Sequence, residues 1–385
     1  MTEEQSSSTH PQLSPTTEED RFSWLRLLRS RRVGVATFQR LLAEHGTAQA
    51  ALVALPEVAR AAGVEGYEAC PPGIIHAELS AAKSAGAQLL CLGDQHYPPM
   101  LAEIADAPPL MWAIGDSALL SRPMLALVGA RNASSLGTRM ARSLAQELGE
   151  QGFLVVSGLA RGIDTAAHLA ALQTGTVAVL AGGVDTFYPA ENTKLTHDIA
   201  RNGLLLSEQP MGMAPQARHF PRRNRIISGV SQAVIVVEAA AKSGSLITAR
   251  DALDQGRDVL AVPGHPFDAR AAGCNMLIRD GAQLVRNAAD VIAALPASAP
   301  AQRDLRDCAA TVTAPPPPPS RKRSLRETAA LHQQILSRLG PSPVAEDQLI
   351  RDLAMPAGRV GPTLVDLEID GKIQRQPGGL LSLSK

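Results

Sequence analysis

Two strand-to-helix units in tandem, at residues 124–164, constrain the fold of this chain more than any other part of its sequence. Residues 124–128 and 153–156 are short, unbroken apolar runs, and each is followed by a glycine-containing turn and then a helical pattern. Short apolar strands that alternate with amphipathic helices indicate a parallel sheet covered on both faces. Ligands of such sheets bind beyond the carboxyl ends of the strands, so we expect the turns at 129–135 and 158–162 to meet there.

Each of these two turns carries an arginine, Arg131 in the first and Arg161 in the second. Positive charge beside a helix N-terminus favours the binding of an anion. The first turn lacks the second and third glycines of the GxGxxG pattern, which let a backbone approach a pyrophosphate. We therefore predict a site for a phosphate of a polymer rather than for a dinucleotide. Arg131 is the better candidate, with Ser134 or Ser135 capping the next helix or sharing the anion.

Further apolar runs extend the predicted sheet on both sides of this stretch. Five more strand candidates follow the first two, at 177–180, 204–206, 233–237, 259–262 and 283–285. We therefore expect an α/β fold, with an open parallel sheet of about seven strands. Two earlier runs, at 88–92 and 110–114, are candidates to join the edge of the sheet.

The segments before the sheet predict an arm and a helical module. Residues 1–20 are polar and rich in Ser, Thr and Glu, which is typical of a disordered arm. Residues 21–70 show short helical patterns around a turn at Val33 and Gly34, and resemble helix-hairpin-helix and sterile-alpha-motif-like modules. Such a glycine turn presents backbone N–H groups to a phosphate, which motivates a DNA hypothesis; the alternative is a small helical domain that only packs on its neighbour. The core is predicted to span 71–295.

The C-terminal part divides into a linker and a small domain. Residues 296–327 include five consecutive prolines and predict a semi-rigid linker. Residues 328–385 show three helical patterns and a hairpin, which is the order of a winged helix. The third helix carries Asp366, Glu368 and Asp370 against one arginine, so this module either reads DNA, contacts a protein or serves packing alone.

Two more segments of the core are candidates for phosphate contacts. Arg222, Arg223 and Arg225 form the densest positive cluster and follow Phe220, which offers a stacking face. The alternative is an arginine-rich helix start that pairs with acids elsewhere. The second segment, Lys242-Ser243-Gly244, lies between a predicted strand and a helix, an arrangement that can cradle a phosphate. It does not have the GxxxxGK spacing of a Walker A motif, which argues against ATP hydrolysis.

Other features limit the classes of function. Lys plus Arg equals Asp plus Glu, at 37 each, so any basic surface must be local. The four cysteines are far apart and indicate reduced thiols of a cytoplasmic protein. No apolar run is long enough to span a membrane, and no metal-binding spacing occurs. His168 lies four residues after Asp164, but we expect no catalytic dyad there and no enzyme activity.

Five motifs in a fixed order point to one family: GARNAS at 129–134, SGLARGIDTAAH at 157–168, FPRRNRIISG at 220–229, EAAAKSGSLITA at 238–249, and AVPGH with GCNMLIRDGA within 261–282. Together they resemble the DNA-processing protein A family, DprA, also called Smf. The resemblance implies a Rossmann-like core without a cofactor, which binds single-stranded DNA during natural transformation, protects it and helps to load the RecA recombinase.

The resemblance also assigns roles to individual residues. It implies phosphate contacts at Arg131, Lys242, Ser243, Gly244 and Asn275, and a homodimer. The dimer interface it implies is the apolar triplet Met276, Leu277 and Ile278. The three arginines at 222, 223 and 225 extend the positive path on the charge argument alone.

The alternative function is a nucleotide-processing enzyme of the phosphoribohydrolase type, which shares the Rossmann-like fold. Those enzymes carry a PGGxGT turn with a glutamate, and this chain has neither. Glu238 is the acid beside the Lys242 turn, and a lone carboxylate is poor support for general acid catalysis.

Overall fold

The structure is a computed structural model, which describes residues 14–295, 325–339, 344–353, 355, 357–376 and 380–383. It divides into two compact units, Met1–Ala301 and Gln302–Lys385. The predicted arm, up to residue 13, and the predicted linker, from 296 to 324, lie outside the described residues.

The first unit begins with four helices, α1 (Glu18–Arg29), α2 (Val35–His45), α3 (Ala48–Ala61) and α4 (Pro72–Ala85). Thr17 starts α1 by a capping box, in which its hydroxyl accepts from the backbone of Asp20 and the Asp20 carboxylate accepts from the backbone of Thr17. Phe38 and Leu41 are among the fully buried side chains that hold these helices together. The predicted turn at Gly34 begins α2.

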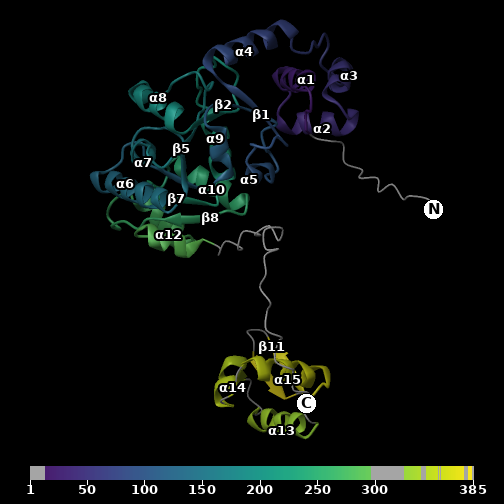
Figure 1. The fold of residues 1–385 in the computed structure, drawn as a ribbon, viewed down its shortest axis with the longest axis vertical. Coiled ribbons are helices and arrows are strands. Elements are labelled where there is room, and N and C mark those ends of the chain that lie inside the picture. Colours follow the sequence, from purple (N-terminus) through teal and green to yellow (C-terminus); the bar gives the residue numbers. More distant parts are fainter. Residues whose placement is uncertain are drawn as a thin grey trace, which may run out of the picture. The chain divides into compact units, whose positions relative to one another are not determined.

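A nine-stranded sheet forms the centre of the first unit (Figure 1), in the order β1-β2-β6-β5-β4-β3-β7-β8-β9. Its strands are β1 (Gln88–Cys91), β2 (Leu110–Gly115), β3 (Met124–Gly129), β4 (Leu154–Ser157), β5 (Thr176–Val179), β6 (Leu204–Ser207), β7 (Ala233–Glu238), β8 (Asp258–Ala261) and β9 (Gln283–Leu284). The seven strands from β3 to β9 are all parallel, as predicted. Two more strands, β1 and β2, extend one edge in antiparallel pairing.

Helices cover both faces of this sheet because successive strand residues point to opposite sides. The helices are α5 (Pro99–Ala102), α6 (Ser135–Glu150), α7 (Ile163–Ala171), α8 (Thr193–Asn202), α9 (His219–Gly229), α10 (Ser245–Asp254), α11 (Ala272–Arg279) and α12 (Ala288–Ala294), with 3-10 turns at Ser117–Ser121 and Ala190–Asn192. Leu125 and Leu127 of β3 pack with α6, α7 and α12, whereas Ala126 and Val128 pack with α9, α10 and α11.

The order of the strands creates a crevice beside β3. From β3 the chain passes through α6 to β4 on one side, whereas β7 pairs with β3 on the other side. The loops that leave β3 and β7 therefore diverge at their carboxyl ends, which is where open α/β sheets bind ligands.

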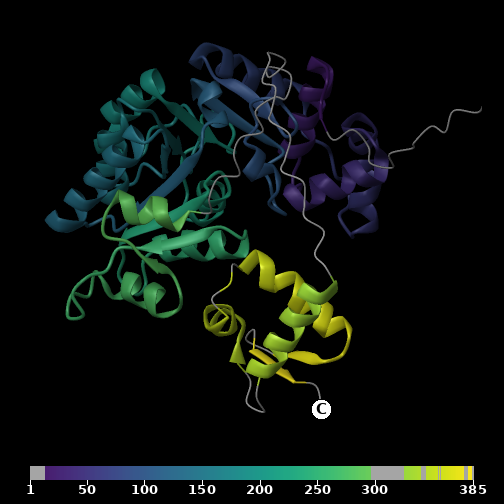
Figure 2. The same ribbon diagram turned by 60° about the horizontal axis from the view of Figure 1, so that its bottom comes forward.

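The second unit has the predicted order of three helices and a hairpin, with one additional short strand (Figure 2). Its elements are α13 (Leu325–Arg338), β10 (Val344–Ala345), α14 (Glu346–Asp352), α15 (Ala357–Ile369), β11 (Ile373–Gln376) and β12 (Leu380–Leu383). The three strands pair in the order β10-β12-β11. Buried side chains at the predicted helical spacing, including Ile335 and Leu364, form its core.

Candidate nucleic-acid interface

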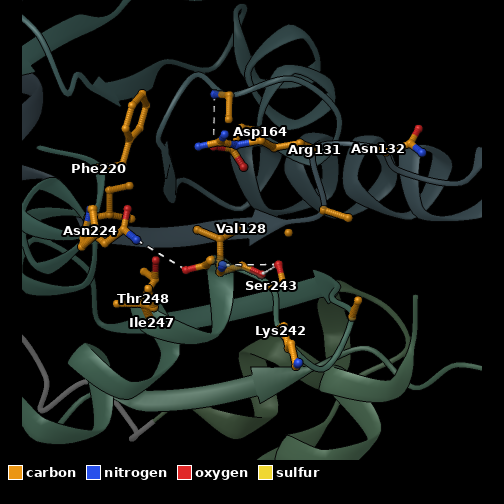
Figure 3. A pocket seen from close by; sticks show the side chains of 18 of the residues that line it. Val128, Arg131, Asn132, Asp164, Phe220, Asn224, Lys242, Ser243, Ile247 and Thr248 are labelled. Atoms are coloured by element: carbon orange, nitrogen blue, oxygen red, sulfur yellow. Dashed lines mark hydrogen bonds between the residues drawn. The ribbon is translucent and has the colours of Figure 1, made fainter. Parts of the chain in front are cut away.

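A cavity of about 590 Å³ opens beyond the carboxyl ends of β3 and β7 (Figure 3). Residues from five separate segments line it: Arg131 after β3, Asp164 after β4, Phe220 on α9, Lys242 after β7 and Arg270 after β8 are among them. The crevice between the two diverging loops therefore contains the first turn of the tandem unit and the Lys242 turn, which lie more than a hundred residues apart in sequence.

The two turns of the tandem unit meet at this cavity, as predicted. The backbone N–H of Ile163 donates to the carbonyl of Ala130 at 3.2 Å. Gly162 has a φ of 77°, and a Cβ at this position would lie 2.2 Å from the Ala130 oxygen. Glycine is therefore required here both by the backbone conformation and by the close approach of the first turn.

Arg131 lies in the loop between β3 and α6, and its side chain is exposed. Its guanidinium carbon is 5.1 Å from the centre of the Phe220 ring, which gives a cation–π contact. Ser134 caps α6 by accepting a hydrogen bond from the backbone N–H of Gly137 at 2.9 Å. Among the described residues, Arg131 has no carboxylate partner, so its charge is available to an anion.

The Lys242 turn connects β7 to α10. Its fold is set by Ser243, whose N–H donates to Ala240 at 2.9 Å and whose hydroxyl lies 2.7 Å from that of Ser245. Lys242 is exposed and, in the described part of the chain, has no carboxylate within ion-pair distance. A Cβ on Gly244 would meet no atom within 4 Å, so the start of α10 is open to solvent. α10 therefore begins at the cavity, and Lys242 precedes its first turn.

Arg223 lines the cavity, but its guanidinium is bound to backbone carbonyls of the protein interior. It is 5% exposed, and its guanidinium donates to the carbonyls of Gly158, at 2.6 Å, and Val179. Burial lowers the pKa of Arg223 to about 10, against the effect of Asp164. Burial raises the pKa of Asp164, although Arg223 and the N–H groups of Ala160 and Gly158 oppose that shift. Arg223 thus fixes the second turn in place and remains charged at neutral pH.

The other two arginines of the cluster, Arg225 and Arg222, differ from each other in burial and in ion pairing. Arg225 is 8% exposed and forms ion pairs with Glu208 at 2.5 Å and with Asp106 at 3.3 Å. The alternative interpretation, an arginine that pairs with acids elsewhere, therefore applies to Arg225. Arg222 is exposed and lines a neighbouring hollow together with Gly34. Of these three side chains, Arg222 is the one whose charge faces solvent.

Asn275 and the apolar triplet lie on α11, outside the lining of the cavity. The Asn275 amide accepts from the N–H of Gly264 at 3.2 Å and donates to its carbonyl at 3.0 Å, so it fixes the loop after β8. Met276, Leu277 and Ile278 are partly buried, and the last two pack against the core. The Leu277 carbonyl accepts from the backbone N–H of Ala282, the residue before β9, which is the edge strand of the sheet.

Two weaker candidates have other partners. Arg161 is exposed and lies 3.8 Å from Glu191, outside the lining of the cavity. His168 is fully buried and its Nδ1 lies 2.8 Å from the hydroxyl of Thr176, so the possible pair with Asp164 does not form. Burial lowers the pKa of His168 to about 3, which keeps the ring neutral.

Asn224 and Arg270 are among the polar residues of the cavity that were not predicted from the sequence. Asn224 lies between the arginines on α9, and its amide donates to the carbonyl of Gly244 at 3.5 Å. Arg270 comes from the loop after β8, where it pairs with Asp268 at 3.2 Å. The local sequence around Arg270 has neither a helix N-terminus nor a glycine pattern that would predict a binding site. Arg270 reaches the cavity only because the loop after β8 folds back toward the end of β7.

The described residues contain neither a metal-binding cluster nor a membrane-spanning helix. No group of three or more His, Cys, Asp or Glu side chains is placed to hold a metal ion there. No helix in the same part of the chain has both the length and the apolar character needed to cross a bilayer. Cys70, Cys91 and Cys274 are buried free thiols.

The model of the DNA recombination-mediator protein A family matches residues 88–296, which is more than half of the chain. The chain belongs to the DNA processing protein A family. A DprA-like N-terminal HHH domain matches residues 18–81, and a DprA winged helix domain matches residues 313–379. The predicted family, the Rossmann-like core and the two flanking modules are thereby confirmed.

Curated relatives and solved structures of this family cover most of the fold. The chain is 48% identical to the DNA processing protein DprA of Streptococcus pneumoniae over 52% of this chain and 71% of that protein. It is 36% identical to protein Smf of Escherichia coli over 77% and 78% of the two chains. The crystal structure of the S. pneumoniae protein aligns with a TM-score of 0.62 and 36% identity, over 71% of this chain and 98% of that one.

A second solved structure bears on DNA. DNA processing protein A of Helicobacter pylori was solved to describe its single-stranded DNA binding mode. It aligns with a TM-score of 0.50 and 31% identity, over 54% of this chain and 94% of that one. Both the family and this structural relative therefore connect the present fold to DNA.

Proposed function

We propose that this chain binds single-stranded DNA and acts as a recombination mediator without catalytic activity or a cofactor. In natural transformation it would protect the incoming strand and help to load the RecA recombinase. The observation that carries the proposal is the convergence of Arg131 and Lys242 on one cavity, each next to the start of a helix and each without a carboxylate partner among the described residues.

The proposed binding mode is mainly electrostatic. Arg131 and Lys242 hold successive phosphates, and the hydroxyl of Ser243 and the backbone at Gly244 add hydrogen bonds at the start of α10. Arg222 extends the positive path along α9. Phosphate contacts of this kind position a strand without reading its sequence, so we expect binding to tolerate any sequence.

We also propose a homodimer through Met276, Leu277 and Ile278. These side chains are only partly buried, and the adjacent edge strand β9 exposes 42% of Leu284. An apolar surface beside an unpaired strand edge favours association with a second copy. Two cavities in one dimer would bind the same strand, which raises the apparent affinity through effective concentration.

The nucleotide-processing alternative has less support from the site. A general acid or base must reach its substrate with a free carboxylate. Asp164 lines the cavity, but its carboxylate accepts hydrogen bonds from the backbone N–H groups of Gly158 and Ala160, each at 3.2 Å. The Glu238 carboxylate accepts from the backbone N–H of Ser134 at 2.9 Å.

The proposal can be tested by measuring the preference for single strands and the contributions of Arg131 and Lys242 to binding. We expect labelled oligo-dT to bind more tightly than a duplex of the same length in fluorescence anisotropy titrations. Arg131→Ala and Lys242→Ala should each weaken oligo-dT binding by about 1–3 kcal/mol, the range for a hydrogen bond to a charged group. Arg201→Ala, an exposed arginine on α8, is the matched control. If both cavity variants bind like the wild type, the assignment of the cavity is wrong.

The mediator role needs a separate measurement. RecA filament formation on oligo-dT covered with single-strand-binding protein should be faster when this chain is added. Arg131→Ala should lose that acceleration because it no longer holds the strand. Tight binding of DNA without any effect on filament formation would retain the binding role and exclude the loading role.

A further inference from the structure

An exposed tyrosine stands apart from the other tyrosines of the chain. Tyr67 and Tyr97 are 7% and 4% exposed, and their hydroxyls donate to the carbonyls of Arg31 and Pro108. Tyr188 is 51% exposed, although the chain has only three tyrosines and its aromatic content is 3%. Folding thus leaves half of a large ring in water, where it contributes little to the core.

Tyr188 is not isolated on the surface, because it contacts Phe220. The ring centres are 5.8 Å apart, and the rings are inclined at 60°. Tyr188 comes from the segment between β5 and α8, whereas Phe220 is the second residue of α9 and lines the cavity. Two distant segments therefore bring aromatic rings together at the rim of the candidate site.

Phe220 also contacts Arg131, as Figure 3 shows for these two side chains. The guanidinium lies on the ring of Phe220, and Tyr188 contacts the same ring. The three side chains consequently form a row that runs from a free cation inside the cavity to a half-exposed aromatic ring outside it.

We propose that Tyr188 and Phe220 form a stacking platform for a nucleobase whose neighbouring phosphate is held by Arg131. This inference rests on the proposed binding of single-stranded DNA and assigns to it a site for the bases. Every base has a π face, so stacking on Tyr188 does not depend on sequence. In this arrangement Phe220 is a positioning residue, because it orients the guanidinium of Arg131 and supports the ring of Tyr188.

The platform gives a physical reason for strand preference. A cavity that binds only phosphates does not favour single strands, because a duplex carries the same charged groups at a higher density. Bases of a duplex are already stacked and paired inside the helix, and exposing one of them costs free energy. A single strand offers its bases without that cost, so the platform favours it.

An oligonucleotide without bases separates stacking from charge. We would titrate wild-type protein and Tyr188→Ala with labelled oligo-dT of about 20 nucleotides and with an abasic phosphodiester of equal length. Tyr188→Ala should weaken binding of oligo-dT by about tenfold, within the range for loss of one stacked base, and leave abasic binding unchanged. Tyr188→Phe should bind like the wild type because it keeps the ring.

Two controls distinguish the outcomes. Phe267→Ala removes a ring that is 95% exposed and lies outside the lining of the cavity, and it should change neither affinity. Arg131→Ala should weaken the binding of both probes. If Tyr188→Ala weakens both probes equally, or neither, the stacking platform is refuted while the phosphate site stands. If the wild-type protein binds neither probe, the proposed function itself fails.

Discussion

Glu238 at the end of β7 holds Ser134 at the start of α6. Its carboxylate accepts from the Ser134 backbone N–H at 2.9 Å and from the Ser134 hydroxyl. Glu238 is 8% exposed, and a Cβ on Gly137 would lie 2.4 Å from one of its oxygens. The carboxylate therefore occupies the helix N-terminus at which other Rossmann-like folds bind a pyrophosphate. The Glu238 carboxylate is therefore the anion at the N-terminus of α6. We expect an incoming phosphate to bind beside Arg131 instead.

Replacement of this carboxylate should destabilise the first unit. Glu238→Ala removes the acceptor for the buried N–H and hydroxyl of Ser134, so we expect the free energy of unfolding to fall by about 1–3 kcal/mol. Urea unfolding followed by circular dichroism measures this loss. Glu65→Ala, an exposed glutamate before α4, should stay within about 0.5 kcal/mol of the wild type. Equal stability of both variants would show that the carboxylate does not support α6.

The salt dependence of binding should report the number of phosphates that the cavity neutralises. For single strands, the slope of log affinity against log salt is about 0.7 per phosphate contact. Arg131→Ala and Lys242→Ala should each reduce that slope by about this amount, whereas Arg161→Ala should leave it unchanged. Titrations between low and moderate sodium chloride give the slope. A slope that Arg161→Ala lowers more than Arg131→Ala does would move the site to the second turn.

Substitution of Arg225 should mainly affect stability, whereas substitution of Arg222 should mainly affect DNA binding. Arg225→Met leaves Glu208 buried without its partner, so we expect a loss of about 3–5 kcal/mol in the free energy of unfolding. Arg222→Met should change stability by less than about 0.5 kcal/mol and weaken oligo-dT binding, since its charge faces solvent. Urea unfolding and anisotropy on both variants test the pair. Similar losses of stability would contradict the different placement of the two side chains.

Asp251 on α10 should make stability depend on pH. Burial, assisted by the carboxylates of Asp106 and Asp254, raises the pKa of Asp251 to about 6, although Arg225 and Arg250 oppose the shift. A raised pKa in the folded state favours the neutral carboxyl, so its contribution to stability is complete below about pH 4 and is lost as the pH rises through about 6.

The variant Asp251→Asn removes this titration. Because Asp251 is only partly buried, we expect the variant to gain about 1 kcal/mol over the wild type at pH 7.5 and nothing near pH 4. Urea unfolding at the two pH values gives the difference. A gain that is independent of pH would exclude the titration of Asp251 as its cause.

The proposed dimer depends on Met276, which is the member of the triplet that does not pack into the core cluster. Met276→Arg places a charge in the interface, so we expect light scattering to give the mass of a single chain, 40.5 kDa, at concentrations where the wild type is a dimer. Val53→Arg, at a position that is 83% exposed on α3, is the control. A wild-type protein that is already monomeric would exclude the interface.

Local patterns were sufficient for the elements and for part of the site. The seven parallel strands follow from short apolar runs, and the winged helix follows from buried positions such as Ile335 and Leu364 at helical spacing. Arg131 and Lys242 could be found in the same way because each precedes a helix that directly follows a strand. In an open parallel sheet, both positions lie at the carboxyl edge whatever the rest of the chain does.

The sequence by itself determined the family, the parallel sheet and the two cations that face the cavity, because these depend on periodicity and on the ends of elements. Only the tertiary structure decided which arginine of α9 keeps its charge available to an anion. Arg222, Arg223 and Arg225 carry the same charge, yet Arg223 is bound to backbone carbonyls and Arg225 to Glu208 and Asp106. Asp106 lies 119 residues away from Arg225 in the sequence. Contacts over such separations depend on how the helices pack on the sheet, and so does the meeting of Tyr188 with Phe220.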